Sequence, residues 1–193
     1  MFWNNWSWPT RILSVCGAAL LALILSPLFS RPRENAHGPS CGSNLKQIGL
    51  GIIQYTQDYD EKFPPVATGR SAYGWADTIQ PYIRSVQVYQ CPQEYTASQS
   101  NPRKSGYTDY PFNKRLSAKP LAKIADLSQQ ILSLDGNAPS DNTDARYSLL
   151  FLPPQWRDDQ NSPLYRHDGT ANTLFADGHL KALTPPQLED APF

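Results

Sequence analysis

The residues best suited to chemistry lie near the end of the chain, in the segment RHDGTANTLFADGHLKAL, from Arg166 to Leu183. His167, Asp168, Asp177 and His179 supply imidazoles and carboxylates, which are metal ligands in many proteins. Each also has a structural explanation. Asp177 suits a turn, His179 can be a surface residue of the returning strand, and His167 can hydrogen-bond the backbone near the turn. No full ligand set is evident, so we expect no metal and a structural role for these residues.

The three cysteines offer a second kind of chemistry. Cys16 lies in a hydrophobic segment, whereas Cys41 and Cys91 lie in the polar remainder of the chain. In an exported domain these two thiols can form a disulfide, and the alternative is two unpaired small residues. Neither has a His or Cys nearby in the sequence at metal-ligand spacing, which argues against a zinc site.

No catalytic motif accompanies these residues. Ser133, Ser148 and His167 are generic groups, without a nucleophile elbow, a phosphate-binding loop or paired carboxylates. The chain has 17 basic and 17 acidic residues, a balance that gives no general attraction for nucleic acid. We therefore expect neither an enzyme, nor a cofactor, nor a nucleic-acid partner.

Several segments have the periodicity of regular secondary structure. Apolar residues recur every three or four positions from Ser43 to Tyr59, which predicts a helix. Residues 172–176 and 179–183 flank Asp177-Gly178, and this pattern predicts a β-hairpin with a type I′ turn. Shorter apolar runs predict a helix and three more strands, in the order Trp75–Ile83, Val86–Tyr89, Gln130–Leu134 and Tyr147–Leu152. One helix followed by short strands indicates an α+β fold, with the helix on an antiparallel sheet.

The N-terminal region contains an uncharged hydrophobic run. Residues 12–29 form 18 uncharged positions between Arg11 and Arg31. As a helix they would extend about 27 Å, close to the thickness of a bilayer core. The run predicts a single transmembrane anchor; a cleaved secretion signal is the alternative, although Leu28-Phe29-Ser30 is a poor cleavage site. We expect an anchor over residues 1–30, a link over 31–42 and one domain over 43–193.

Two segments resemble a known family. They are SCGSNLKQIGLGIIQYTQDYDEKFPP, from Ser40 to Pro65, and the segment in which nine residues separate His167 from Asp177-Gly178. Together they resemble bacterial prepilin-type proteins with an H-X9-DG motif, which look like type II secretion pseudopilins. The resemblance implies a pilin-like fold and a non-enzymatic component of a type II secretion or type IV pilus-like system, or a membrane-tethered relative. It also implies an inner-membrane protein with its C-terminal domain outside the cytoplasm, and other pilin-like subunits as partners through the N-terminal helix.

The N-terminus departs from the family pattern. The family has a Gly before the cleavage site of its peptidase and a Glu shortly after that site. Here the corresponding cut would fall between Asn5 and Trp6, and Thr10 stands at the position of the Glu.

The competing hypothesis is a membrane-anchored extracytoplasmic metal-dependent enzyme or binding module built on His167, Asp177 and His179.

Overall fold

The computed structural model describes residues 8–9, 12, 14–17, 40–67, 73–94, 100–137 and 142–193. The chain divides into two units, residues 1–38 and residues 39–193. In the first unit the described residues are helical. Among all described residues, no helix has the length and apolar character required to cross a membrane. Most of the predicted anchor, and most of the predicted link, lie outside the described residues.

The first helix of the second unit, α2, covers Cys41–Asp58. It confirms the predicted helix but begins two residues earlier, because Ser40 and Ser43 cap its N-terminus reciprocally. The Ser43 amide donates to Ser40 Oγ at 3.1 Å, and the Ser40 amide donates to Ser43 Oγ at 3.0 Å. Asp60 and Glu61 follow with φ angles of 51° and 52°, a left-handed conformation that ends the helix.

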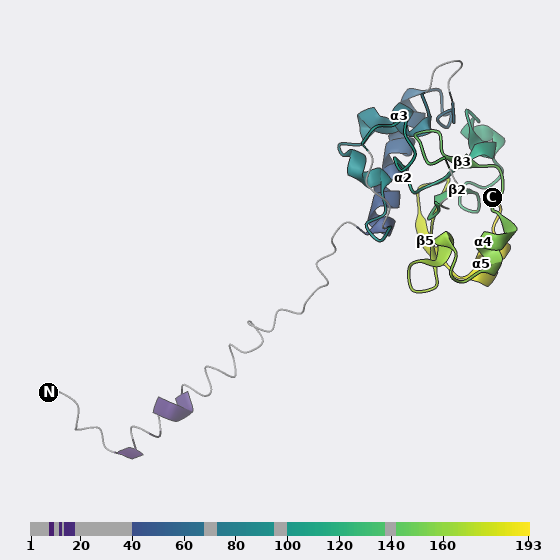
Figure 1. Ribbon diagram of the computed structural model, residues 1–193. Helices are drawn as coiled ribbons and strands as arrows, with labels where there is room; N and C mark the ends of the chain where they lie inside the picture. Colours follow the sequence, from purple (N-terminus) through teal and green to yellow (C-terminus); the bar gives the residue numbers. More distant parts are fainter. Residues whose placement is uncertain are drawn as a thin grey trace. The chain divides into compact units, whose positions relative to one another are not determined.

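The unit is a mixed α/β fold, with helices packed around a central sheet (Figure 1). The sheet has five strands in the order β3-β1-β2-β4-β5. Neighbouring strands are antiparallel except β1 and β3, which are parallel, so the predicted antiparallel sheet is in fact mixed. The strands are β1 Phe112–Asn113, β2 Ile131–Leu134, β3 Ser148–Leu149, β4 Ala171–Phe175 and β5 Leu180–Leu183.

Short helices fill the connections between these strands. The predicted helix at residue 75 forms as α3 with a following 3-10 turn, η1. The predicted strand Val86–Tyr89 is wrong, because this segment is the 3-10 helix η2. Its adjacent residues Val88 and Tyr89 both belong to the buried cluster that contains the apolar residues of α2, whereas a strand would direct them to opposite faces. The short helices are α3 Trp75–Ile79, η1 Gln80–Tyr82, η2 Val86–Tyr89, η3 Lys114–Leu116, η4 Leu121–Lys123, α4 Pro154–Asp158, η5 Pro163–Tyr165 and α5 Pro185–Glu189.

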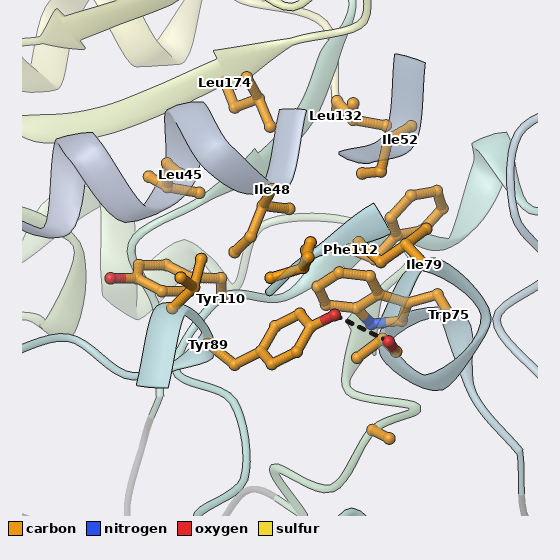
Figure 2. Close-up of a cluster of buried hydrophobic side chains, with 14 of the residues drawn as sticks. Leu45, Ile48, Ile52, Trp75, Ile79, Tyr89, Tyr110, Phe112, Leu132 and Leu174 are labelled. Carbon is orange, nitrogen blue, oxygen red and sulfur yellow. Dashed lines mark hydrogen bonds between the residues drawn. The ribbon is translucent and has the colours of Figure 1, made fainter. Parts of the chain in front are cut away.

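Hydrophobic clusters cover both faces of the sheet. On one face, α2 packs over an aromatic group in which Trp75 stacks on Phe112, with ring centroids 5.6 Å apart, and meets the edge of Tyr89 (Figure 2). On the other face, Trp156 of α4 and Leu188 of α5 belong to a second cluster with strand residues. Covering both faces explains why all four residues of β2 are buried.

Glycine allows α2 to lie close to the sheet. A Cβ atom on Gly49 would lie 2.7 Å from Cδ1 of Leu174 in β4, too close for a real contact. On another side of the helix, a Cβ on Gly51 would lie 2.9 Å from Cγ1 of Ile83. These two positions therefore bring the helix backbone against its neighbours at a distance that a side chain would prevent.

The β4–β5 hairpin forms where the sequence predicts it, but with a different turn. The Gly178 amide donates to the Phe175 carbonyl at 2.9 Å, and the Phe175 amide donates to the His179 carbonyl at 2.9 Å. Gly178 has a φ of 87°, whereas Asp177 does not have a positive φ. These features define a three-residue loop with a left-handed glycine, the common alternative to the two-residue type I′ turn.

Gly178→Ala should destabilise the domain more than Gly169→Ala. Both glycines have a left-handed φ, so each substitution costs about 1–2 kcal/mol in backbone strain. A Cβ on Gly178 would also lie 2.4 Å from Cδ1 of Ile53 in α2, whereas a Cβ on Gly169 has nothing within 4 Å. We expect about 1–3 kcal/mol of additional loss for Gly178→Ala from overpacking, measured as the free energy of unfolding in urea. Equal losses for the two variants would show that the hairpin does not press on α2.

Candidate functional site

Strand β4 separates the residues that the sequence analysis grouped as possible ligands. His167 precedes β4, whereas Asp177 and His179 lie in the turn that follows it. Nδ1 of His179 lies 2.7 Å from Oδ1 of Asp177, and its ring stacks on Phe175 with centroids 4.2 Å apart. The structure therefore does not bring His167 together with Asp177 and His179.

The Asp-Gly turn contacts α2 instead. Lys46 of α2 donates from Nζ to the Gly178 carbonyl at 2.9 Å. Asp177 Oδ1 accepts a hydrogen bond from the His179 amide at 3.0 Å, which closes the turn. These contacts give Asp177 and Gly178 a part in positioning the hairpin on the helix.

Cys41 and Cys91 form a disulfide, with their Cα atoms 4.9 Å apart. Cys41 is the first residue of α2, and Cys91 follows η2, so the bond ties the helix N-terminus to a loop 50 residues away. Both residues are buried. A cross-link of this length removes about 4 kcal/mol of chain entropy from the unfolded state in the loop-closure model.

His167 lies beside this disulfide and beside a buried carboxylate. Its Nε2 atom is 3.3 Å from Oδ2 of Asp135 and 3.7 Å from Sγ of Cys91. Asp135 is only 1% exposed, and its Oδ2 also accepts from the amide and from Nδ2 of Asn172, both at 2.9 Å. The His167 side chain thus lies against Asp135 and the disulfide, in one cluster. The predicted role was a hydrogen bond from His167 to the backbone near the turn.

The sheet topology explains why residues so far apart in the sequence meet. Asp135 directly follows β2, and β2 runs antiparallel to β4, so the end of one lies beside the beginning of the other. The Asp135 amide accordingly donates to the Asn172 carbonyl at 3.1 Å. The N-terminus of α2 lies over the same point, since a Cβ on Gly42 would lie 3.3 Å from Oδ1 of Asn172.

A second buried carboxylate, Asp109, holds the loop that carries Cys91. Its Oδ2 accepts from the Cys91 amide and its Oδ1 accepts from Nδ2 of Asn137, each at 2.7 Å. Burial raises the pKa of Asp109 to about 6, despite the opposing effect of these hydrogen bonds. Neither Asp109 nor Asp135 belongs to a local motif, so the sequence did not predict that these carboxylates lie beside the disulfide.

A cavity of about 460 Å³ opens next to this cluster. Cys91 and Asp109 line it together with polar groups, among them Asn44, Gln90 and Glu94. Chemically, the region combines two sulfurs, an imidazole and a carboxylate whose donor atoms all lie within 4.8 Å of one another. The side chains that line the cavity can hydrogen-bond a polar ligand, whereas the two sulfurs, while joined in the disulfide, are not thiolate ligands for a cation.

Comparison with known families gives one match. Residues 30–118 match the model of a family described as "Protein of unknown function (DUF1559)". The matched region includes α2, both cysteines of the disulfide and Asp109, and it ends before the H-X9-DG segment. No curated protein and no solved structure matches the chain. The chain is therefore similar to this family over somewhat less than half of its length.

Asp109→Asn should change how stability depends on pH. With its pKa raised from 3.8 to about 6 on folding, the Asp109 carboxyl favours the folded state when protonated. The stabilisation that this carboxyl contributes is complete below its pKa in the unfolded chain. That stabilisation, at most about 3 kcal/mol, is lost as pH rises through about 6. The free energy of unfolding of the native chain should therefore fall relative to that of Asp109→Asn between pH 4 and pH 7. Urea unfolding across this range measures it, and a constant difference between the two proteins would contradict the assignment.

Proposed function

We propose that this chain is a non-enzymatic, pseudopilin-like component of a type II secretion or type IV pilus-like system, or a membrane-tethered relative. The observation that carries the proposal is the fit between α2 and the H-X9-DG segment. That segment forms β4 and β5, and its glycine turn rests on Ile53 and Lys46 of the helix. The two segments that resemble the prepilin-type family are thus the two that pack together, as a pilin-like helix on its sheet would.

We propose that residues 12–29 anchor the chain in the bacterial inner membrane, with the C-terminal domain outside the cytoplasm. The uncharged run and the flanking tryptophans support the anchor. The Cys41–Cys91 disulfide supports an extracytoplasmic domain, because disulfides persist in oxidising compartments. Partners in this proposal are other pilin-like subunits, contacted through the N-terminal helix.

The positions of these side chains argue against the competing hypothesis. A metal-dependent enzyme or binding module based on His167, Asp177 and His179 requires these side chains to converge. They lie at opposite ends of β4, and His167 contacts Asp135 instead. We therefore favour the pilin-like role.

Crosslinking in native membranes tests the proposed partners. A photoreactive residue in place of Ala19, within the proposed anchor, should crosslink to another pilin-like chain. The same residue in place of the exposed Tyr73 of the domain serves as the matched control and should not give that product. Mass spectrometry of the crosslinked bands identifies the neighbour. Absence of any pilin-like neighbour at Ala19 would count against the proposed function.

The mature N-terminus tests the proposed anchor. We expect it to begin at Met1 or at Trp6, which correspond to an intact anchor and to prepilin-like cleavage. Intact-mass measurement of the chain extracted from membranes with detergent distinguishes these two starts. A start beyond Ser30 would mean a released domain and would overturn the membrane assignment.

A further inference from the structure

The cluster at the N-terminus of α2 contains the four residue types of a tetrahedral metal site, with its two sulfurs joined in a disulfide. Cys41 and Cys91 supply sulfur, His167 supplies an imidazole nitrogen and Asp135 supplies a carboxylate oxygen. Zn²⁺ takes these ligand types, most often four at a time. Sequence spacing gave no indication of such a site, because the four residues come from four separate segments of the chain.

Two of the donor separations already suit a tetrahedral ion. Zinc–ligand bonds of about 2.0–2.3 Å place neighbouring ligand atoms roughly 3.3–3.8 Å apart. His167 Nε2 lies 3.3 Å from Asp135 Oδ2 and 3.7 Å from Cys91 Sγ. The two sulfurs lie closer together than this because a disulfide bond joins them. All four donor atoms lie within 4.8 Å of one another.

The two oxygens of the Asp135 carboxylate differ, because Oδ2, the oxygen beside His167, already accepts from Asn172, whereas Oδ1 has free lone pairs that a metal could use. Its Oδ1 is buried and has no hydrogen-bond partner within the part of the chain that the structure describes. A buried, unpartnered carboxylate oxygen is costly and calls for an explanation such as a cation. Asn172 meanwhile fixes the carboxylate through two hydrogen bonds to Oδ2, the kind of support that orients metal ligands.

We propose that reduction of the Cys41–Cys91 disulfide creates a site for one divalent zinc-type ion, held by Cys41, Cys91, Asp135 and His167. A dithiol reductant supplies two electrons and two protons, becomes a disulfide itself, and leaves two thiols on the chain. The ion then displaces the two thiol protons and binds the thiolates. Oxidation reverses the exchange, because sulfurs joined to each other are no longer thiolate ligands.

The two states would cross-link the same parts of the fold. The disulfide joins the start of α2 to the loop after η2, and the ion would join these to the end of β2 and the beginning of β4. The domain would thus keep a covalent or a metal cross-link in either redox state. Cys91 is the one proposed ligand that lines the cavity, and an ion would enter from that side. This site is independent of the pilin-like role, and its failure would leave the crosslinking prediction unaffected.

Cobalt binding tests the proposal on the full-length chain in detergent. The chain is reduced with dithiothreitol, separated from the reductant under anaerobic conditions and titrated with Co²⁺. We expect one equivalent to bind with the intense visible bands of tetrahedral Co²⁺ and a thiolate charge-transfer band, and we expect Zn²⁺ to displace it. The oxidised chain should show neither band. Co²⁺ binding without thiolate bands, or equal binding by the oxidised chain, would overturn the proposal.

Ligand variants separate this site from simple capture of a metal by two thiols. His167→Gln and Asp135→Asn should each weaken Co²⁺ binding by about 100-fold or more and alter the visible bands, since ligands matter more than their supporting residues. His179→Gln, which changes a histidine beyond the opposite end of β4 and outside the cluster, is the matched control and should bind normally. Near-ultraviolet circular dichroism reports the fold in parallel. Unchanged binding in both ligand variants, or a reduced chain that loses its tertiary signal and does not regain it with Zn²⁺, would overturn the proposal.

Discussion

The close approach of α2 to strand β4 determines how the remaining elements can be placed. Gly49 leaves no side chain between the helix and Leu174, so the helix axis lies nearer to the sheet than larger residues would permit. At this separation three apolar side chains of α2 reach the aromatic group around Trp75, namely those of Leu45, Ile48 and Ile52 (Figure 2). These three residues and Trp75 are fully buried. The same approach brings the helix N-terminus to the beginning of β4 and its middle to the turn at the end of β4.

The glycines of α2 lower its intrinsic helix stability, and the burial of its apolar side chains must offset that loss. Each glycine inside a helix costs about 1 kcal/mol relative to alanine, and α2 contains three, at positions 42, 49 and 51. Burial of one leucine or isoleucine side chain contributes about 1.5–3 kcal/mol. The buried side chains of α2 therefore outweigh its glycines only while the helix stays on the sheet. An isolated α2 would be a poor helix, which makes its stability a property of the whole domain.

The sequence predicted those elements whose pattern is local. The helix α2 and the hairpin strands β4 and β5 follow from periodicity and from a glycine turn, and all three form. Strand β1 was not predicted, because Phe112–Asn113 is too short to show a period and pairs only with distant strands. The candidate site was only partly visible for the same reason. His167 stood out through its motif, but its partner Asp135 lies 32 residues earlier and meets it only through the antiparallel pairing of β2 with β4.

The spacing of nine residues in the H-X9-DG segment has a physical origin in this fold. Residues 168–170 form a tight turn in which the Thr170 amide and hydroxyl donate to the His167 carbonyl, and residues 171–175 are the strand β4. Ala176 then leads into the Asp-Gly turn. His167 must reach Asp135 at one end of the strand while Gly178 must reach Ile53 of α2 at the other. One residue more or less would direct every side chain of β4 to the wrong face of the sheet, so the spacing is set by a strand fixed at both of its ends. The histidine and the Asp-Gly pair consequently act at different places, the first within the donor cluster and the second against the helix, although one motif contains both.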